Sequence, residues 1–453
     1  MNIKKLFFKK NFIKSGPELW EEAKSVIPGG NQLLSKRSER FLPGKWPAYF
    51  RYAKGCAVED LDGNKFYDFA AMGVGSCVLG YSDPEVNKAV HRAIEMGSMS
   101  TLNSYEEVAL AKELIQLHPW SGMCRFARSG GEACAIAVRI ARASSGRPNV
   151  AFCGYHGWHD WYLSANLSKS SNLDDQLLPG LSSKGLPRNL ASTSFPFRYN
   201  KIEQLKNILY KEKKSIGTII MEPIREEDPK NSFLEQVRFL ADENKCVLIF
   251  DEITSGFRIC PGGAHLKLGV NPDIVVLGKA LGNGFPISAV LGKRKIMDAA
   301  QDTFISSTFW TERIGFTAGL ATIKKFKQVK AWQSLIENGR KIKTGWKEIA
   351  KELGISLNIT GIDPLPNFCF NESESQLKMT IFTKEMLEQG FLASSGPYLS
   401  YAHNQAIIAK YLKACKKTLK KIREHELKNK LTTLLQGKIA NMGFIRLTSH
   451  ETK

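Results

Sequence analysis

The chain contains short runs of Val, Ile and Leu, and two of them end in charged residues. The run "VLIFDE" ends in Asp251 and Glu252, and the run "PDIVVLGK" ends in Lys279. Runs of this length and composition predict strands that are buried on both faces of a parallel sheet. Asp251 and Lys279 would then lie at the carboxyl ends of strands, where open α/β sheets bind their ligands.

The rest of the pattern predicts helices and strands in alternation. "SGPELWEEAKSVIPGG" predicts a short helix with Ser15 as its N-cap, and "AVEDLDGNKFYDF" predicts a hairpin at Asp62 and Gly63. From Pro119 onward, strand-like runs ("CRFARS", "NVAFCGY", "TIIMEP") alternate with helix-like runs ("EACAIAVRIARASS", "IEQLKNILYKEKK", "FLEQVRFLADENK"). This alternation predicts an α/β fold with a mainly parallel sheet covered by helices.

From about Lys330 the pattern changes to long basic helices with a few strands. We therefore predict three regions. Residues 1–75 form an N-terminal segment that packs with a small domain, residues 76–325 form a large domain, and residues 326–453 form the small α+β domain.

The composition is that of a soluble globular protein. The 453 residues are 43% hydrophobic, which is enough for a large core. No apolar run reaches the roughly 18 residues of a membrane span, and lysines interrupt the N-terminal stretch where a signal peptide would be apolar. The 9 cysteines are scattered, without a CxxC pair, so buried thiols are expected rather than disulfides or a metal site. These features predict a cytoplasmic location and no membrane partner.

A net charge of +20 raises a nucleic-acid partner as an alternative. Part of the excess lies in "KYLKACKKTLKKIREHELKNK", where no motif that reads RNA or DNA is present and no stacking aromatics are interleaved. Solvated helix faces are the favoured interpretation of this charge.

Three features indicate chemistry. In "RSGGEACAIAV", Ser129, Gly130 and Gly131 precede a helix, where free backbone N–H groups bind anions, although two glycines before a helix also make a simple turn. Lys279 in a partly desolvated position would have a lowered pKa and act as a nucleophile, or it could reach the surface. Asp251 could hold a charged group or simply cap a helix.

Together the three fit pyridoxal phosphate, which needs a lysine for its aldehyde, a carboxylate for its ring nitrogen and an anion site for its phosphate. The glycine fingerprint of dinucleotide-binding enzymes and the phosphate loop of ATP-binding enzymes are both missing from the sequence. A nicotinamide or ATP enzyme is therefore disfavoured.

The sequence resembles the class III aminotransferases of fold type I, in the branch of glutamate-1-semialdehyde aminomutase. The most specific stretch is "LIFDEITSGFRICPGGAHLKLGVNPDIVVLGKALGNGFPISAVLGKR". The resemblance implies a mainly parallel, seven-stranded-type sheet and a pyridoxal 5'-phosphate enzyme. It makes Lys279 the lysine that bonds the cofactor and Asp251 the partner of the pyridine nitrogen. In "GYHGWHD" it makes Tyr155 the aromatic residue over the cofactor ring, with His156 beside it.

The resemblance also implies phosphate contacts from Ser129, Gly130 and Gly131. Here "SGGE" departs from the usual Ser-Gly-Thr-Glu, so a side-chain hydroxyl is lost at Gly131. Thr308 in "SSTF" matches a threonine that reaches the phosphate of the neighbouring subunit, which implies a homodimer with shared sites.

The segment "WTER" replaces a common Gly-Asn-Pro. Glu312 and Arg313 are therefore candidates for the substrate entrance, with packing at the subunit interface as the equal alternative.

Two segments bear on the reaction. "NQLLSKRSERF" replaces the arginine-bearing segment of the mutase, and "LASSGPYLSYAH" lacks the acid that the mutase carries before "AH". Both differences favour an aminotransferase, which moves an amino group from an amino-acid donor to an aldehyde or keto acceptor. By the same resemblance, that acceptor is sugar-derived, for surface polysaccharide. The aminomutase remains the alternative, and Lys36 or Arg37 either binds an anionic substrate or is a solvated loop charge.

Overall fold

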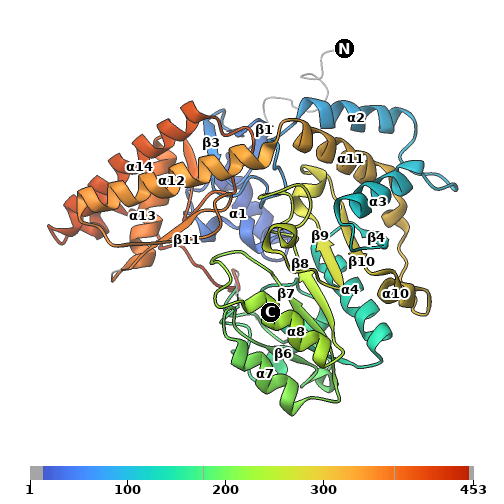
Figure 1. Ribbon diagram of the computed structural model, residues 1–453. Coiled ribbons are helices and arrows are strands. Elements are labelled where there is room, and N and C mark those ends of the chain that lie inside the picture. The colour runs from blue at the N-terminus through green and yellow to red at the C-terminus, as the bar shows by residue number, and fades with distance from the viewer. Residues whose placement is uncertain (1–13, 177, 372, 448–453) are drawn as a thin grey trace.

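A seven-stranded sheet forms the core of the larger lobe in the computed structural model, which describes residues 14–176, 178–371 and 373–447 (Figure 1). The strand order is β4-β10-β9-β8-β7-β5-β6. The strands are β4 (Met123–Ala127), β5 (Asn149–Cys153), β6 (Ser194–Pro196), β7 (Ile216–Met221), β8 (Val247–Asp251), β9 (Ile274–Leu277) and β10 (Ser288–Gly292). Only β10 runs antiparallel to its neighbours, β4 and β9. The predicted α/β fold with a mainly parallel sheet is confirmed.

Hydrophobic layers cover both faces of this sheet. On one face the alanine-rich side of α4 (Gly130–Ser145) packs against alternate strand residues, including Val247 and Ile249 of β8. Leu248 and Phe250 of the same strand belong to the layer on the other face. Helices of that second layer are α2 (Pro84–Glu95), α3 (Tyr105–Leu117), α7 (Ile202–Lys211), α8 (Phe233–Glu243) and α11 (Arg313–Gln328). Successive residues of β8 therefore face opposite helical layers.

A smaller lobe combines both ends of the chain. Its long helices are α12 (Ala331–Leu353), α13 (Ser375–Glu388) and α14 (Gln405–Glu426). Its strands are β1 (Phe50–Lys54), β2 (Ala57–Asp60), β3 (Lys65–Phe69), the pair β11 (Leu357–Thr360) and β12 (Asn367–Phe370), and β13 (Phe391–Ala393).

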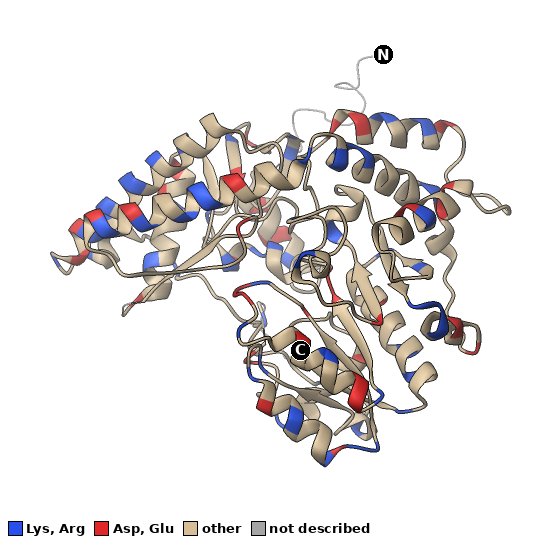
Figure 2. Ribbon diagram, in the orientation of Figure 1, with Lys and Arg blue, Asp and Glu red and all other residues tan. Residues whose placement is uncertain are grey.

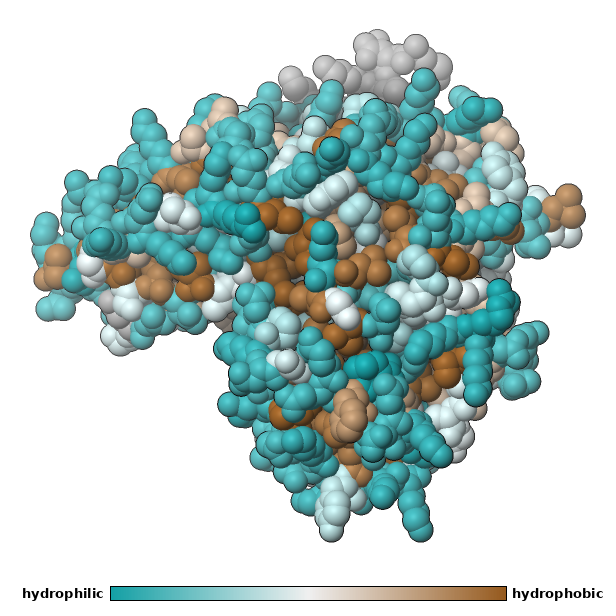
Figure 3. Space-filling model, in the orientation of Figure 1, coloured by the Kyte–Doolittle hydropathy of each residue, from teal (hydrophilic) through white to brown (hydrophobic). Residues whose placement is uncertain are grey.

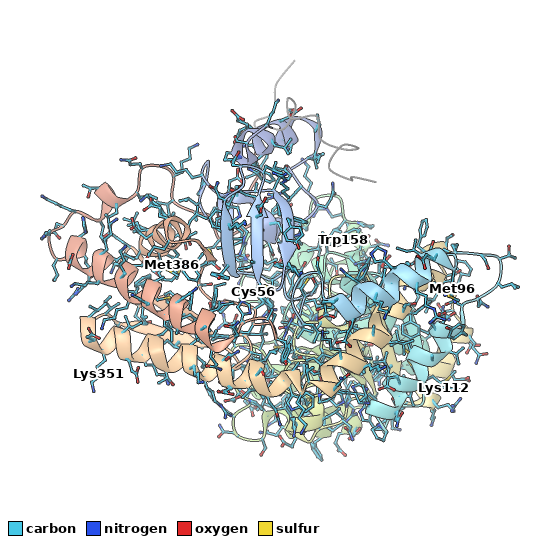
Figure 4. The ribbon with its side chains drawn as sticks, turned by 90° about the horizontal axis from the view of Figure 1, so that it is seen from above. Cys56, Met96, Lys112, Trp158, Lys351 and Met386 are labelled. Carbon is cyan, nitrogen blue, oxygen red and sulfur yellow. The ribbon has the colours of Figure 1, made fainter. Side chains whose placement is uncertain are left out.

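The predicted hairpin is β2–β3, and β13 joins β3 in parallel, so N-terminal and C-terminal segments share one sheet. Seen from above, this sheet, with Cys56 beside it, lies between Met386 on α13 and the region of Met96, which follows α2, and Lys112 on α3 (Figure 4). The pairing agrees with an N-terminal segment that packs with the small domain, and the three boundaries themselves stay predictions.

The chain begins, within the described residues, with the predicted helix α1 (Gly16–Val26). Ser15 caps it, and the side chain of Glu18 accepts a hydrogen bond from the backbone N–H of Ser15 at 2.9 Å. Beyond α14 the chain runs back to this region, where the N–H of Asn441 donates to the carbonyl of Glu39 at 2.7 Å. The two distant ends of the described chain are thus in contact.

The basic helices carry carboxylates among their lysines, as Figure 2 shows along α12 and α14. Lys416 pairs with Glu352 of α12 at 2.7 Å, and Lys421 pairs with Glu385 of α13 at 2.7 Å. Such interleaved charges favour the interpretation as solvated helix faces. None of the described helices is long and apolar enough to cross a membrane. The lysine-rich N-terminal stretch lies outside the described residues.

The cysteines are free, and seven of them are buried, with Cys124 partly buried and Cys369 exposed. This agrees with the prediction of buried thiols. Burial raises the pKa of such thiols, as it does for Cys260, to about 12.

Candidate active site

Asp251 and Glu252 are adjacent in the chain and serve different parts of the molecule. Because β8 alternates between faces, Asp251 turns toward α4 and Glu252 toward the opposite layer. There Glu252 is fully buried and accepts hydrogen bonds from the N–H of His265 at 2.9 Å and from the ring of His265 at 2.5 Å. Burial acts to raise the pKa of Glu252, but the bonds from His265 outweigh it and lower the pKa. Glu252 is therefore a structural carboxylate.

Asp251 is held at the carboxyl end of β8 by three donors. Its Oδ2 lies 2.7 Å from Nδ1 of His156 and 3.3 Å from the thiol of Cys134, and its Oδ1 accepts from the N–H of Ile253 at 3.1 Å. The next helix, α9 (His265–Leu268), begins far beyond Asp251, so the helix-cap alternative is wrong. The buried carboxylate is instead fixed in orientation.

Cys134, His156 and Asp251 also lie close enough together to hold a metal ion. However, burial raises the pKa of the Cys134 thiol far above its usual range, and metals bind the thiolate. The protonated thiol suits its role as a hydrogen-bond donor to Asp251. The expectation of no metal stays a prediction.

Lys279 follows β9 and Gly278, as predicted, and starts a short 3₁₀ helix, η5 (Lys279–Gly282). Its φ of 37° lies in the left-handed region, which is strained for a residue with a side chain and is typical of functional sites. Its Nζ donates to the hydroxyl of Thr254 at 2.6 Å. Burial lowers the pKa of Lys279, which raises the share of neutral amine that can act as a nucleophile.

The predicted phosphate residues stand at the start of α4, with Ser129 as the N-cap. Glu132 accepts hydrogen bonds from the backbone of Ser129 at 2.9 Å and of Arg128 at 3.2 Å. A Cβ on Gly130 would come within 2.7 Å of Ile253, two residues beyond Asp251. The helix start therefore lies against the segment that follows β8, close to Asp251.

Tyr155 and His156 follow β5 at the same edge of the sheet. His156 is buried, and its Nε2 lies 3.1 Å from the carbonyl of Cys153. Tyr155 is partly buried and packs edge-on against Tyr162 at 5.8 Å between ring centres. Burial raises the pKa of Tyr155, and the charge of Asp251 adds to this shift. Ser129, Gly130, Gly131, Asp251 and Lys279 thus surround one edge of the sheet together with these two side chains.

Thr308 is the residue predicted to reach the phosphate of a neighbouring subunit. It is exposed at the start of the 3₁₀ helix η7 (Thr308–Thr311). Its neighbours Phe304 and Phe309 are exposed as well, by 84% and 69%. An assignment of Thr308 to a partner's site stays a prediction.

Glu312 and Arg313 have structural partners. Glu312 caps α11 by accepting from the N–H of Ile314 at 2.5 Å, and it forms an ion pair with Arg128 at 3.8 Å. Arg313 pairs with Glu106 of α3 at 3.0 Å. Neither residue lines the pocket described next.

A cavity of about 350 Å³ lies where the two lobes meet. Its cationic side chains among the described residues are Arg40 and Arg225, and Tyr398 supplies a phenol. The segment 394–398 forms one wall, and Ala440 and Met442 close the cavity from the C-terminal side. Figure 3, in the orientation of Figure 1, shows apolar side chains at the surface in the middle of the view, surrounded by hydrophilic ones.

Arg225 connects this cavity to the cofactor edge. Its Nη1 lies 2.9 Å from Glu222, which follows β7, and its Nη2 lies 3.4 Å from the hydroxyl of Tyr398. Burial raises the pKa of Glu222, and Arg225 counteracts this shift. Burial would also raise the pKa of Tyr398, but the nearby cations Arg225 and Lys279 outweigh it and lower the pKa. The cavity and Lys279 therefore belong to one electrostatic cluster.

The sequence-based candidates for an anion site in the N-terminal loop were Lys36 and Arg37. Lys36 is exposed, and Arg37 donates to the carbonyl of Ile445 at 3.0 Å. Arg40, three residues further, lines the cavity instead and donates to the carbonyl of Met442. The sequence does not identify three residues of the cavity wall, Arg40, Arg225 and Tyr398, because each lies in a segment without a recognisable motif. The one signal is the "EP" that ends the strand-like run before Arg225.

The comparison with protein families decides the class. Residues 44–423 match the model of the family described as aminotransferase class III. The chain belongs to the class III aminotransferases. It is thus a pyridoxal-phosphate-dependent enzyme of fold type I, as the resemblance implied.

Two relatives are about equally similar to this class III aminotransferase. The 3-aminobutyryl-CoA aminotransferase of Cloacimonas acidaminovorans is 32% identical over 90% of this chain and 97% of its own. The glutamate-1-semialdehyde 2,1-aminomutase of Methanobrevibacter smithii is 32% identical over 78% of this chain and 82% of its own. The family therefore includes both the transfer and the mutase reaction.

The fold has a counterpart among solved structures. The FumI protein of Sphingopyxis sp. MTA144, solved in its PLP internal aldimine form, superposes with a TM-score of 0.83. It covers 93% of this chain and 100% of its own at 24% identity, so the likeness concerns the fold.

The residues of this class III aminotransferase fit the cofactor. A buried, oriented carboxylate, a lysine of lowered pKa and a helix start without side chains at two positions are what the pyridine ring, the aldehyde and the phosphate each need.

Proposed function

We propose that this class III aminotransferase is a transaminase that releases a keto product from an anionic amino donor and passes the amino group to an aldehyde or keto acceptor. The cofactor, when bound, supplies an aldehyde for the amino group and an electron-withdrawing ring. The Nζ of Lys279 would hold the cofactor through its aldehyde group, and the neutral amine would carry the proton that moves to and from the substrate carbon. Asp251 keeps the proton on the pyridine nitrogen, and its bonds to His156 and Cys134 hold it in place for this task.

The composition of the cavity wall is the observation that carries the transaminase assignment. Residues 394–398 line the cavity with serines, glycine, proline and Tyr398, and offer no carboxylate. Among the described lining residues, Glu226 on another segment is the one acid. A mutase must hold its intermediate until the amine returns at a neighbouring carbon, and this wall lacks the acid that the resemblance associates with that gate.

Arg225 supports an anionic substrate. It lies in the cavity wall and forms an ion pair with Glu222. A substrate carboxylate or phosphate can take the place of Glu222 as the anionic partner of Arg225. Arg40 adds a second cation to the same cavity. A sugar-derived acceptor for surface polysaccharide remains an expectation from the resemblance.

Product release separates the two reactions. We expect the yellow enzyme to lose its visible absorbance with one of a panel of amino donors, glutamate included, and to release one keto acid per active site. Isomerisation of glutamate-1-semialdehyde to 5-aminolevulinate without added donor, together with no keto acid from any donor, would establish the mutase, to which curated relatives also belong.

We also infer a homodimer with shared sites, because Thr308 is exposed among apolar residues. Phe304, Phe309 and Leu102 are large side chains exposed by 84%, 69% and 81%, and apolar residues of this size gather at subunit interfaces. Light scattering should give twice the chain mass. Thr308→Val should weaken cofactor retention by about 1–3 kcal/mol, whereas the exposed Thr432→Val should not. A monomer that retains the cofactor as tightly would rule out sharing.

A further inference from the structure

Gly131 lies in close contact with the loop that follows β5. A Cβ on Gly157 of this loop would come within 2.8 Å of the Cα of Gly131, and Gly157 has a φ of 104°, which favours glycine. The loop therefore rests directly on the first turn of α4. The usual threonine at position 131 would have to fit beneath it.

The side chain of His159 fills the space that a residue at position 131 would occupy. A Cβ on Gly131 would lie 3.0 Å from both Cε1 and Nδ1 of His159. The neighbouring Trp158 stacks on the imidazole at 4.6 Å between ring centres and is itself 69% exposed. Figure 4 labels Trp158 near the middle of the view. The imidazole of His159 thus lies at the start of α4, next to Gly131 and stacked on Trp158.

Nδ1 of His159 is buried and has no hydrogen-bond partner in the described part of the chain. Buried nitrogens without partners are rare in folded proteins, because the lost hydrogen bond is not replaced. Burial also lowers the pKa of His159, so the ring is mainly neutral near pH 7 and carries one N–H to donate. The tautomer with its proton on Nδ1 offers a donor where the family uses a hydroxyl.

We propose that His159 donates a hydrogen bond to the phosphate of the cofactor and so replaces the side-chain hydroxyl that Gly131 lacks. The absence of a side chain at position 131 is what gives the imidazole its room, so the two positions act as a pair. A phosphate oxygen accepts the N–H of His159 while the free backbone N–H groups of the helix start bind the remaining oxygens.

The first test compares pyridoxal phosphate with pyridoxal, which lacks the phosphate. Apo-enzyme is titrated with each compound and binding is followed by absorbance. His159→Phe keeps a ring without a donor and should weaken pyridoxal phosphate about 10- to 100-fold while leaving pyridoxal unchanged. His159→Gln retains an N–H and should recover part of the loss. The exposed His91→Phe on α2 is the matched control and should change neither.

The second test uses the pair. Gly131→Thr alone should weaken pyridoxal phosphate, because the new side chain meets His159 at 3.0 Å or less. Gly131→Thr combined with His159→Ala restores a hydroxyl and frees its space, so this double variant should bind more tightly than either single variant. The phosphorus resonance of the bound cofactor should shift in His159→Phe and not in His91→Phe.

Three results would overturn the proposal. Equal weakening of pyridoxal and pyridoxal phosphate in His159→Phe would give His159 a purely structural role, and unchanged affinity for both would remove it from the phosphate site. If His159→Phe lowers the melting temperature of the apo-enzyme, the double variant Gly131→Thr, His159→Ala provides the test. A loss of affinity for pyridoxal phosphate equal to the sum of the losses in its two single variants would contradict a functional pair.

Discussion

The two sides of this active site are assembled differently. The proposed cofactor side draws on residues 129–131, 155–159, 251–254 and 279, which follow strands of one mainly parallel sheet or start a helix next to it. The substrate side draws single residues from loops near 40, 225, 398 and 442, which belong to both lobes. The sheet thus places the groups that any substrate needs, and the loops place those that select one. Substitutions on the two sides should accordingly impair different properties of the enzyme, mainly kcat on the cofactor side and KM on the substrate side.

The largest effect is expected at Lys279. Lys279→Ala removes the amine that we propose bonds the cofactor and carries the proton, so kcat should fall about 10⁴-fold or more. Borohydride reduction followed by mass spectrometry should find the cofactor on Lys279 in the wild type and no adduct in the variant. Lys267→Ala, on the exposed side of α9, is the control. An adduct on another lysine would show the assignment to be wrong.

Asp251→Asn should lower kcat about 10³-fold while the cofactor stays bound, because the neutral amide no longer keeps the pyridine nitrogen protonated. Stopped-flow measurement of the first half-reaction tests this directly. Asp62→Asn, in an exposed turn, should react at the wild-type rate. Near wild-type turnover in Asp251→Asn would leave the carboxylate only its role in holding His156 and Cys134.

Glu252 sharpens the contrast because it lies next to Asp251 and faces away from the site. Glu252→Gln should destabilise the fold by about 2–4 kcal/mol with little change in kcat for the folded fraction, as measured by denaturant unfolding. The lowered pKa of Glu252 means that its contribution is present above the ordinary carboxyl pKa of 4.5 and is lost as pH falls through the folded pKa. The stability gap between wild type and variant should therefore narrow below pH 4.5. A gap that is constant down to acid pH would indicate a packing effect instead.

The smallest effect of the four, expressed as a free energy, is expected on the substrate side. Arg225→Ala should raise KM for an anionic donor about 10- to 100-fold with a smaller change in kcat, whereas a neutral amine should be affected little. Arg225→Lys keeps the charge without the bidentate geometry, so its KM for an anionic donor should lie between those of the wild type and Arg225→Ala. Arg51→Ala on the exposed β1 is the control. An equal loss for neutral and anionic amines would mean that Arg225 supports Glu222 rather than the substrate.

The same contrast explains what the sequence alone could predict. The runs that end in Asp251 and Lys279 are recognisable because a strand buried on both faces leaves a short continuous apolar run with a clear end point in the sequence. The structure has both strands where they were predicted. The split between Asp251 and Glu252 also follows from strand alternation once the strand is known.

The substrate side left no such pattern. Arg40 was passed over for Lys36 and Arg37 because only the fold decides which side of the loop faces the cavity. Tyr398 reaches Arg225 across a long stretch of chain, and nothing in "SSGPYLSYAH" signals that contact. The packing of His159 on Gly131 likewise depends on how the loop after β5 lies on α4, which no local spacing encodes.

Strand β10 lies between β4 and β9, and this position constrains the order in which the sheet can form during synthesis on the ribosome. Because β4 pairs only with β10, the first strand of the sheet has no partner until residues 288–292 have been made. Once they are made, all strands of the cofactor edge exist, whereas Tyr398 and Met442 have yet to be synthesised. A growing chain can thus form the strands that end next to Asp251 and Lys279 before the cavity-lining residues Tyr398 and Met442 have been synthesised.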